Sequence, residues 1–426
     1  MIDTEKDNRK LVERAILIGI HTHQENSADA HEHLAELEEL VANLNIPVMD
    51  KMVVKIKQPQ VKYYIGSGKA NEIVEMIAEQ KIDCLVFDSD LSASQQRNWE
   101  RLTKICVIDR QEVILDIFAS RATTREAVLQ VHLARMKYSL PRLTRAWTHL
   151  SRQRGGNKGT RGEGEKQIEA DRRLVQQRIT SLKRELEEVQ KQRSTQRKGR
   201  DRHQLPHAAI VGYTNAGKSS LLNALTGSNV VAEDKLFATL DPTTRKIVLP
   251  DNRQLLLTDT VGFVRKLPHN LIEAFKSTLE EAVVADFLLL ILDLSSPHVE
   301  EHWETTMSVL RELKADNKKI LPIFNKIDLA EDPLIYARVK NLFEESIFVS
   351  TKTGVGLDEL RYKLIKYLPK TTEVIKLKIP PSRHDLVALA HARGLVMDSE
   401  YDEYGNLALV VNVNSEMKNK FAAFMV

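Results

Sequence analysis

The stretch that decides the fold is residues 208–227, which read AAIVGYTNAGKSSLLNALTG. The apolar run AAIV precedes a loop that contains Gly212 and Gly217, and the helical segment LLNALTG follows Lys218 and Ser219. This order of strand, glycine-rich loop and helix predicts a phosphate-binding loop, because glycines let backbone N–H groups face phosphate oxygens at a helix N-terminus. The alternative, a glycine-rich turn without a ligand, is disfavoured by the flanking strand and helix.

Two side chains of this loop have specific predicted roles. The Lys218 ammonium would reach the β- and γ-phosphates and assist catalysis, and the Ser219 hydroxyl would coordinate Mg²⁺. The nucleotide-contacting residues predicted in the loop are Gly212, Tyr213, Thr214, Asn215, Ala216, Gly217, Lys218 and Ser219.

Three further motifs each follow an apolar strand, and together they favour GTP over ATP. They are Asp259-Thr-Val-Gly262, Asn325-Lys-Ile-Asp328 and Ser350-Thr-Lys352. Asp259 would hold Mg²⁺ through water, and the Gly262 amide would meet the γ-phosphate during catalysis. Asp328 would accept hydrogen bonds from the ring N–H and amino group of guanine, whereas adenine has no matching donors. The backbone N–H groups of Ser350, Thr351 and Lys352 can donate hydrogen bonds to the guanine carbonyl. The predicted contacts are Asp259, Thr260, Val261, Gly262, Asn325, Lys326, Ile327, Asp328, Ser350, Thr351 and Lys352.

The segment FATLDPTTR, residues 237–245, is polar, contains a proline and lies between the phosphate-binding loop and Asp259. It predicts a switch loop that γ-phosphate and Mg²⁺ would order. The sequence leaves Thr239, Thr243 and Thr244 open as the metal ligand. Many GTPases place a Gln directly after the DxxG motif to orient the attacking water, but this chain has Phe263 there, which cannot exchange a proton. Water positioning is therefore expected from elsewhere, with slow hydrolysis that a macromolecular partner accelerates.

The rest of the chain predicts a multidomain α/β protein. Alternating apolar strands and helices up to residue 109 predict a parallel α/β domain. A long helix is expected over about 110–138 and another over about 165–196, whose apolar seam predicts an antiparallel hairpin with a glycine-rich tip. The predicted parts are an N-terminal α/β domain (1–109), the helical hairpin (110–202), a P-loop GTPase domain (203–369) and a small C-terminal α+β domain (370–426).

Composition narrows the class of protein. The 426 residues are 42% hydrophobic and 28% charged, which is typical of a folded globular protein and argues against wholesale disorder. Two cysteines are too few for a disulfide framework and indicate a reducing compartment. The sequence contains neither a signal-peptide pattern nor an apolar run long enough for a membrane span. We therefore expect a cytoplasmic protein that is monomeric when free.

The ordered motifs resemble P-loop GTPases of the translation-factor class. The loop FATLDPTTR is similar to that of Obg-type GTPases, and this resemblance implies Thr239 as the Mg²⁺ ligand, with Phe237, Ala238, Thr239, Leu240 and Asp241 at the nucleotide. The segments YYIGSGKANEI, DLSASQQRNWE and DRQEVILDIFASRATTREAVLQVHLARMKYSLPRL resemble the HflX family, as does the glycine-rich stretch 147–174. That stretch departs from the family pattern at Glu163 and Lys166, where proline and a hydroxyl residue are usual.

The resemblance implies a function and partners. HflX proteins bind the large (50S) ribosomal subunit and its 23S rRNA, so the implied function is a GTPase with GTP and Mg²⁺ as cofactors that splits or rescues stalled ribosomes. The alternative is a large-subunit assembly or hibernation factor that binds rRNA, with GTP as a conformational switch. Ribosomal particles are expected to stimulate hydrolysis.

Charge distribution supports an RNA partner independently. The near-neutral net charge of +3 conceals residues 135–202, which carry 20 Lys and Arg against 8 Asp and Glu. A solvated helix face is the alternative explanation for such a run, but its clustering near glycines favours contact with RNA phosphates. Trp147 adds a stacking face. The predicted RNA-contacting residues are Arg142, Arg145, Arg152, Arg154, Lys158 and Arg161.

Two weaker patterns have structural explanations. Gly66-Ser-Gly-Lys69 resembles a second nucleotide loop, but Tyr63 stands in place of the first glycine and Ala70 replaces the metal-binding hydroxyl. A turn into a helix is therefore favoured over an accessory ATP or RNA-phosphate site. Secondary ATP hydrolysis by the protein is a separate expectation. His21, His23, His31 and His33 lack the acid or thiol arrangement of a zinc site. We expect a strand end and an exposed helix at these histidines.

Overall fold

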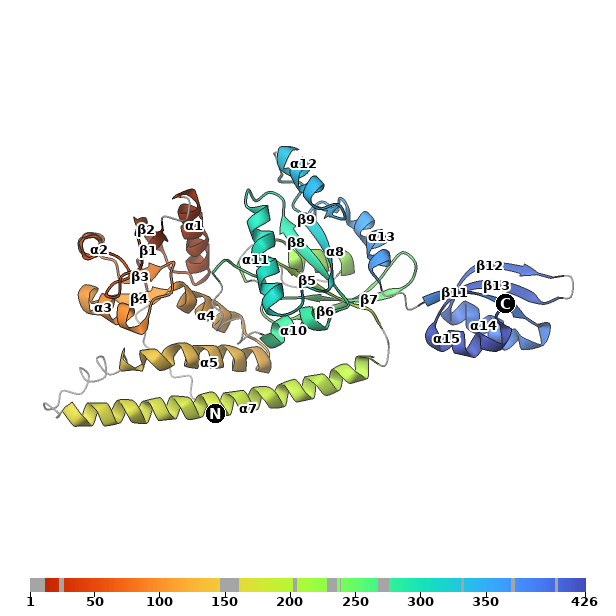
Figure 1. The fold of residues 1–426 in the computed structure, drawn as a ribbon, viewed down its shortest axis with the longest axis horizontal. Coiled ribbons are helices and arrows are strands. Elements are labelled where there is room, and N and C mark those ends of the chain that lie inside the picture. Colours follow the sequence, from red (N-terminus) through yellow and green to blue (C-terminus); the bar gives the residue numbers. More distant parts are fainter. Residues whose placement is uncertain are drawn as a thin grey trace. The chain divides into compact units, whose positions relative to one another are not determined.

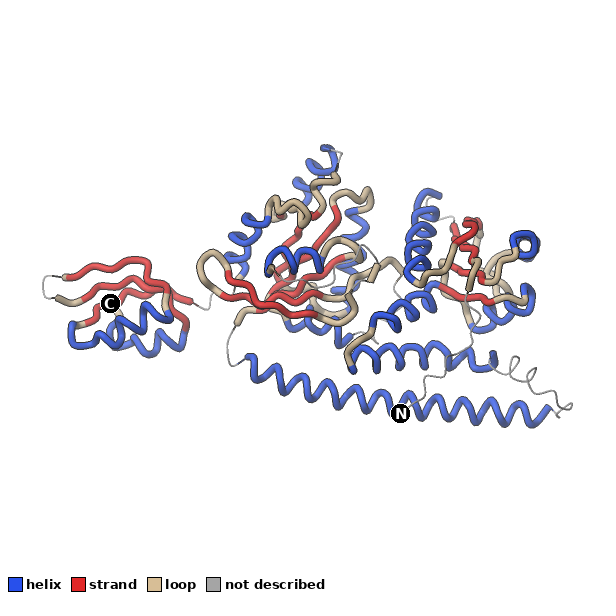
Figure 2. The backbone as a smooth tube through the Cα atoms, turned by 180° about the vertical axis from the view of Figure 1, so that it is seen from behind, coloured by secondary structure: helices blue, strands red, loops and turns tan. Residues whose placement is uncertain are grey.

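The computed structural model describes residues 12–22, 27–145, 161–201, 205–227, 236–237, 239–266, 276–330, 333–368, 372–402 and 405–426. The chain forms two compact units, Met1–Leu360 and Arg361–Val426. The first unit contains two sheets with helices on their faces (Figures 1 and 2). The finer division into four domains stays a prediction.

The first sheet is entirely parallel, with strand order β2-β1-β3-β4. Alternate residues face opposite sides: Leu17 and Val86 pack with α1 and α4, whereas Ile18 and Phe87 pack with α2 and α3. Burial on both faces is typical of parallel sheets, and it confirms the parallel layer predicted from the sequence. The elements are β1 Ala15–His21, α1 Ser27–Asn43, β2 Val48–Lys55, α2 Ser67–Gln80, β3 Cys84–Phe87, α3 Ala93–Thr103 and β4 Cys106–Asp109.

The single helix predicted over 110–138 is two helices, α4 Arg110–Arg121 and α5 Arg125–Ser139. The backbone leaves helical geometry at Ala122, and Thr124 then caps α5, with its hydroxyl accepting a hydrogen bond from the N–H of Ala127. A threonine is a strong N-cap, so the correction has a local cause: the Thr-Thr pair starts a new helix.

The 41-residue helix α7, Arg161–Asp201, lies beside α5 (Figure 1). Leu182 is buried against Leu129 and Leu133 of α5, and Ile179, Leu186 and Val189 pack around them. The antiparallel hairpin as a whole stays a prediction. The 3-10 helix η1, Leu140–Arg145, follows α5, and the predicted hairpin tip at 146–160 lies outside the described residues. No described helix, this longest one included, is apolar enough over a sufficient length to cross a membrane.

The second sheet has the order β10-β9-β8-β5-β7-β6, with only β6 antiparallel to its neighbour. Because β7 and β8 flank β5 on opposite sides, the loop after β5 leaves from a topological switch point, where α/β sheets bind ligands. The elements are β5 His207–Gly212, α8 Lys218–Thr226, β6 Thr243–Val248, β7 Gln254–Asp259, α10 Lys276–Val284, β8 Phe287–Asp293, α11 Val299–Glu312, β9 Lys319–Asn325, α12 Pro333–Leu342, β10 Ile347–Phe348 and α13 Leu357–Tyr367.

The second unit contains an antiparallel sheet of order β11-β13-β12. Its core joins Leu377 and Val411 of the sheet to Phe421 at the end of α15. The elements are β11 Thr372–Ile379, η2 Pro381–Arg383, α14 His384–Arg393, β12 Leu395–Tyr401, β13 Leu407–Asn414, α15 Ser415–Phe421 and η3 Ala422–Phe424.

Candidate nucleotide-binding site

The loop between β5 and α8 needs its two flanking glycines. A Cβ on Gly212, whose φ is +148°, would lie 2.2 Å from the carbonyl oxygen of Ile291. A Cβ on Gly217, whose φ is +95°, would lie 2.1 Å from Nδ2 of Asn325. Only glycine fits both the backbone angles and the space, and the loop then leads into the N-terminus of α8, which favours anions.

Lys218, the first residue of α8, is buried beside this loop. Its Nζ donates to the carbonyl oxygen of Tyr213 at 2.7 Å. Burial lowers the pKa of Lys218 to about 8, although the charge of Asp259 opposes this shift. A Cβ on Gly262 would lie 2.7 Å from the same ammonium, so the structure brings together the two residues predicted to face the γ-phosphate. A buried ammonium that gains a negative ligand would be stabilised in its charged form.

Ser219, Thr239 and Asp259 converge on one point. Ser219 Oγ donates to Asp259 Oδ2 at 2.6 Å and lies 2.8 Å from Thr239 Oγ1. Asp259 is buried, its Oδ1 has no hydrogen-bond partner among the described residues, and burial raises the pKa of its carboxyl. Thr244, by contrast, meets Thr258 on the sheet at 2.8 Å. Two hydroxyls around a carboxylate with a spare oxygen fit a hard cation such as Mg²⁺.

The predicted base-recognition residues form a second group. Asn325 ties two loops together: its Nδ2 donates to the carbonyl oxygen of Ala216 at 2.9 Å, and its Oδ1 accepts from the N–H of Thr351 at 3.1 Å. The exposed Asp328 accepts a 2.6 Å hydrogen bond from the buried Ser350 hydroxyl, which lowers the pKa of Asp328. The carboxylate stays ionised and keeps an oxygen available to donors of a base.

Several predicted contacts turn their side chains elsewhere. Thr260 donates to the carbonyl oxygen of Ile210 at 2.7 Å, and Val261 is buried in the core. Lys326 forms a 2.7 Å ion pair with Asp293. At these positions only the backbone remains for a nucleotide. The Lys352 ammonium acts at a distance, where its charge helps to lower the pKa of Asp328.

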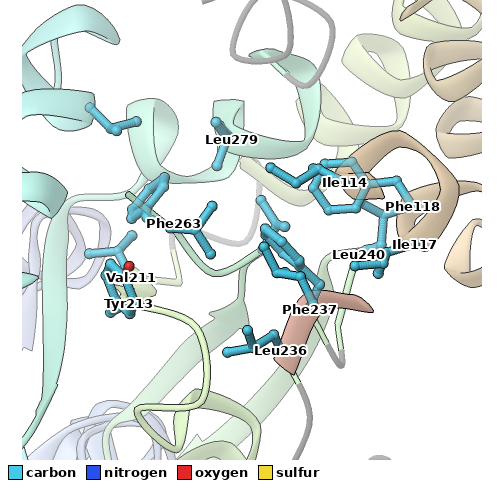
Figure 3. Close-up of a cluster of buried hydrophobic side chains, with 14 of the residues drawn as sticks. Ile114, Ile117, Phe118, Val211, Tyr213, Leu236, Phe237, Leu240, Phe263 and Leu279 are labelled. Atoms are coloured by element: carbon cyan, nitrogen blue, oxygen red, sulfur yellow. The ribbon is translucent and has the colours of Figure 1, made fainter. Parts of the chain in front are cut away.

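In the switch segment, the Thr239 side chain turns toward Ser219. Phe237 and Leu240 are buried beside α4 (Figure 3). The Asp241 carboxylate bonds to the turn between α4 and α5. The side chains of Phe237, Leu240 and Asp241, which were predicted to lie at the nucleotide, therefore contact α4 and the turn after it instead. Ala238 lies outside the described residues.

Sequence reasoning missed a polar cluster around Tyr213. The Tyr213 hydroxyl donates to Glu36 Oε2 at 2.5 Å and accepts from the N–H of Arg265 at 2.8 Å, and burial raises the pKa of this phenol. Glu36 also pairs with the buried Arg110, and the ring of His302 stacks on Tyr213 with centroids 3.9 Å apart. These contacts join residues far apart in the chain, so no local pattern could have indicated them.

Arg142 is not available to RNA as predicted. Its guanidinium donates to Leu91 O and Gln96 Oε1, pairs with Asp109 at 3.3 Å and lies over the ring of Tyr138. Its side chain is only 11% exposed, so its role is structural. The side chains of the other predicted contacts, Arg145, Arg152, Arg154, Lys158 and Arg161, lie outside the described residues.

The two weaker patterns have ordinary structures. Gly66 precedes α2 as its N-cap, and Lys69 forms an ion pair with Glu72 on the same helix. Within the described ranges, no group of three or more His, Cys, Asp or Glu could hold a metal ion. His23 lies outside them.

Most of the chain matches known protein families. Residues 31–119 match the family described as GTP-binding GTPase N-terminal, residues 121–200 match GTP-binding GTPase Middle Region, and residues 207–326 match 50S ribosome-binding GTPase. The chain is 48% identical to GTPase HflX of Akkermansia muciniphila, over 99% of this chain and 98% of that protein. It is 40% identical to GTPase HflX of Escherichia coli, over 94% and 93% of the two chains.

Among solved structures, a GTP-binding protein from Sulfolobus solfataricus in complex with GDP is 28% identical, with a TM-score of 0.43, over 83% of this chain and 98% of that chain. The two HflX relatives align with this chain over nearly its whole length at 40% identity or more. The matched family regions include the phosphate-binding loop, residues 259–262 and Asn325, and the 50S ribosome-binding GTPase match ends before Asp328. The chain therefore belongs to the HflX family of GTPases.

Proposed function

We propose that the protein hydrolyses GTP to GDP and phosphate while bound to the large ribosomal subunit, and that this cycle splits or rescues stalled ribosomes. One observation carries the proposal: the segment that brings Thr239 to Ser219 also contacts the turn between α4 and α5 through Asp241. A change at the γ-phosphate would therefore move contacts outside the nucleotide site. The matched family description, 50S ribosome-binding GTPase, names the partner that the proposal adopts.

Within this proposal, Ser219 and Thr239 coordinate Mg²⁺ and Asp259 holds it through water. The metal supplies neutralisation of developing phosphate charge. Lys218 binds the β- and γ-phosphates, the Gly262 amide orients the γ-phosphate, and Asp328 selects guanine.

The residue that follows Gly262 is unsuited to positioning the attacking water. Phe263 is fully buried, its N–H donates to the carbonyl oxygen of Gly212 at 3.1 Å, and its own carbonyl oxygen accepts from the N–H of Thr214 at 2.8 Å. The proposal therefore includes slow hydrolysis by the free protein and stimulation by ribosomal particles, which would order the water. The proposal also includes secondary ATP hydrolysis, which an assay with ATP in place of GTP tests; absence of phosphate release from ATP would remove this part.

Sedimentation of ribosomes tests the main proposal. We expect intact particles to separate into subunits with GTP or a non-hydrolysable analogue but not with GDP. Lys218→Ala should lose this nucleotide dependence, whereas Lys246→Ala, which alters an exposed lysine on β6, should behave as the wild type. Unchanged particles that co-sediment with the protein in every nucleotide state would instead support a large-subunit assembly or hibernation factor, for which GTP is a conformational ligand.

A further inference from the structure

Asp241 makes an unusually complete set of contacts for a residue two positions from a predicted metal ligand. Its Oδ2 accepts hydrogen bonds from the N–H groups of Thr123 and Thr124, both at 3.1 Å, and from the Thr123 hydroxyl at 2.6 Å. Its Oδ1 accepts from the Thr124 hydroxyl. All four donors lie in the turn between α4 and α5, more than one hundred residues away in the sequence.

The position of this carboxylate is electrostatically favourable. Thr124 is the N-cap of the 15-residue helix α5, so Asp241 lies at the positive end of a helix dipole. Hydrogen bonds to a charged acceptor are stronger than those between neutral groups, so the four donors favour a close contact between this carboxylate and the turn.

The residues before Asp241 are held by the same region. Phe237 is buried with its ring 4.6 Å from that of Phe118, edge to face, and Leu240 lies against Ile114 and Ile117 (Figure 3). The backbone of Phe237 has φ +57°, a left-handed conformation that is strained for a bulky residue. Because packing against α4 compensates this strain, the segment depends on α4 for its conformation.

We propose that the turn between α4 and α5 is the receptor for the switch segment, and that Asp241 is a positioning residue that closes on Thr123 and Thr124 when Thr239 reaches the metal. This inference rests on the proposed function and adds a source of nucleotide preference: contact with this turn favours binding of the triphosphate over GDP. Binding free energies are reciprocal, so a partner that displaces this turn weakens GTP binding, and GTP binding secures the turn. Asp241 acts through Thr239 and touches no reacting atom.

Hydrogen exchange of the Thr123 and Thr124 amides reports on this contact directly. Both N–H groups donate to Asp241, so they should exchange more slowly with Mg²⁺ and GMPPNP than with GDP. Asp241→Ala should remove the difference. It should also weaken GMPPNP binding about fivefold or more and GDP binding less than about twofold, since allosteric coupling is typically of this size.

Two variants separate positioning from a general structural effect. Thr123→Val removes one hydroxyl donor at an exposed position, leaves the Thr124 cap of α5 intact and should share its effect with Asp241→Ala in a double-mutant cycle. Asp251→Ala alters a carboxylate paired with Arg253 in the turn between β6 and β7 and should change neither exchange nor nucleotide preference. Equal amide exchange in both nucleotides, or equal weakening of both by Asp241→Ala, would overturn the inference alone. Failure of the wild type to bind GMPPNP would overturn the proposed function as well.

Discussion

Lys218 links nucleotide binding to pH. Its pKa of about 8 in the folded protein is below the usual 10.5, so between these values the unfolded chain binds the proton and the folded chain does not. Burial of the charge therefore destabilises the folded protein below about pH 8, and this cost disappears as pH rises toward 10.5. Phosphates would restore the charge, so we predict that GTP binding takes up a proton at about pH 9 but not at about pH 7.

Calorimetry in two buffers of different ionisation enthalpy measures this uptake. Lys218→Arg is the matched control, because a guanidinium stays protonated throughout this pH range and should bind GTP without proton uptake. The same buffer dependence at both pH values in the wild type would contradict the assignment of Lys218 to the phosphates.

At the residue scale, the sequence motifs predicted where the backbone of a residue lies better than where its side chain points. Gly212 and Gly217 have the backbone geometry, and Asp259 has the strand-end position, on which their predicted roles depend, and the roles themselves stay predictions. Phe237 and Asp241 were predicted at the nucleotide, but their side chains contact residues from another part of the chain. A local pattern carries no information about such distant partners.

At the element scale, the strands of the first sheet were predicted because buried parallel strands need apolar runs. The strand β6, Thr243–Val248, was missed: its first three residues lie in the segment predicted as a switch loop, and it is antiparallel to β7. The break between α4 and α5 was missed, although Thr124 is a good N-cap, since the apolar spacing continues across it. The break has a consequence beyond helix length: it creates the turn whose N–H groups bond Asp241.

The contact between α5 and α7 gives an element-scale prediction. Leu182 is 1% exposed and packs against Leu129 and Leu133, whereas Leu174 on the same helix is 62% exposed. Leu182→Ala should destabilise the packing of α7 by about 2–5 kcal/mol, the usual cost of truncating a buried leucine. Hydrogen exchange along α7 should rise while GTP affinity stays unchanged.

Leu174→Ala is the control, because truncating an exposed leucine should leave exchange along α7 as in the wild type. Equal effects of the two substitutions would show that α7 is not held by this cluster.

At the scale of the whole molecule, charge is divided unevenly along the chain. Residues 135–202 have a net charge of +12, and the remaining residues together have −9. Internal pairing accounts for part of the basic excess, since Arg142 bonds to Asp109 and Arg135 to Asp116. The predicted contacts that remain for the proposed RNA binding are Arg145, Arg152, Arg154, Lys158 and Arg161. A basic segment within an acidic chain would direct one element to RNA while the rest resists non-specific adhesion.

The salt dependence of binding to large ribosomal subunits tests this division of charge. Each phosphate contact adds about 0.7–0.9 to the slope of log affinity against log salt concentration. Replacing Arg152, Arg154, Lys158 and Arg161 together by Gln should therefore reduce that slope by about 3. The matched control replaces four exposed lysines of the first sheet's region by Gln, namely Lys55, Lys57, Lys81 and Lys104. If both quadruple variants lose the same slope, binding follows total charge and the basic segment has no special role. An unchanged slope in the first variant would instead place the RNA contacts elsewhere in the chain.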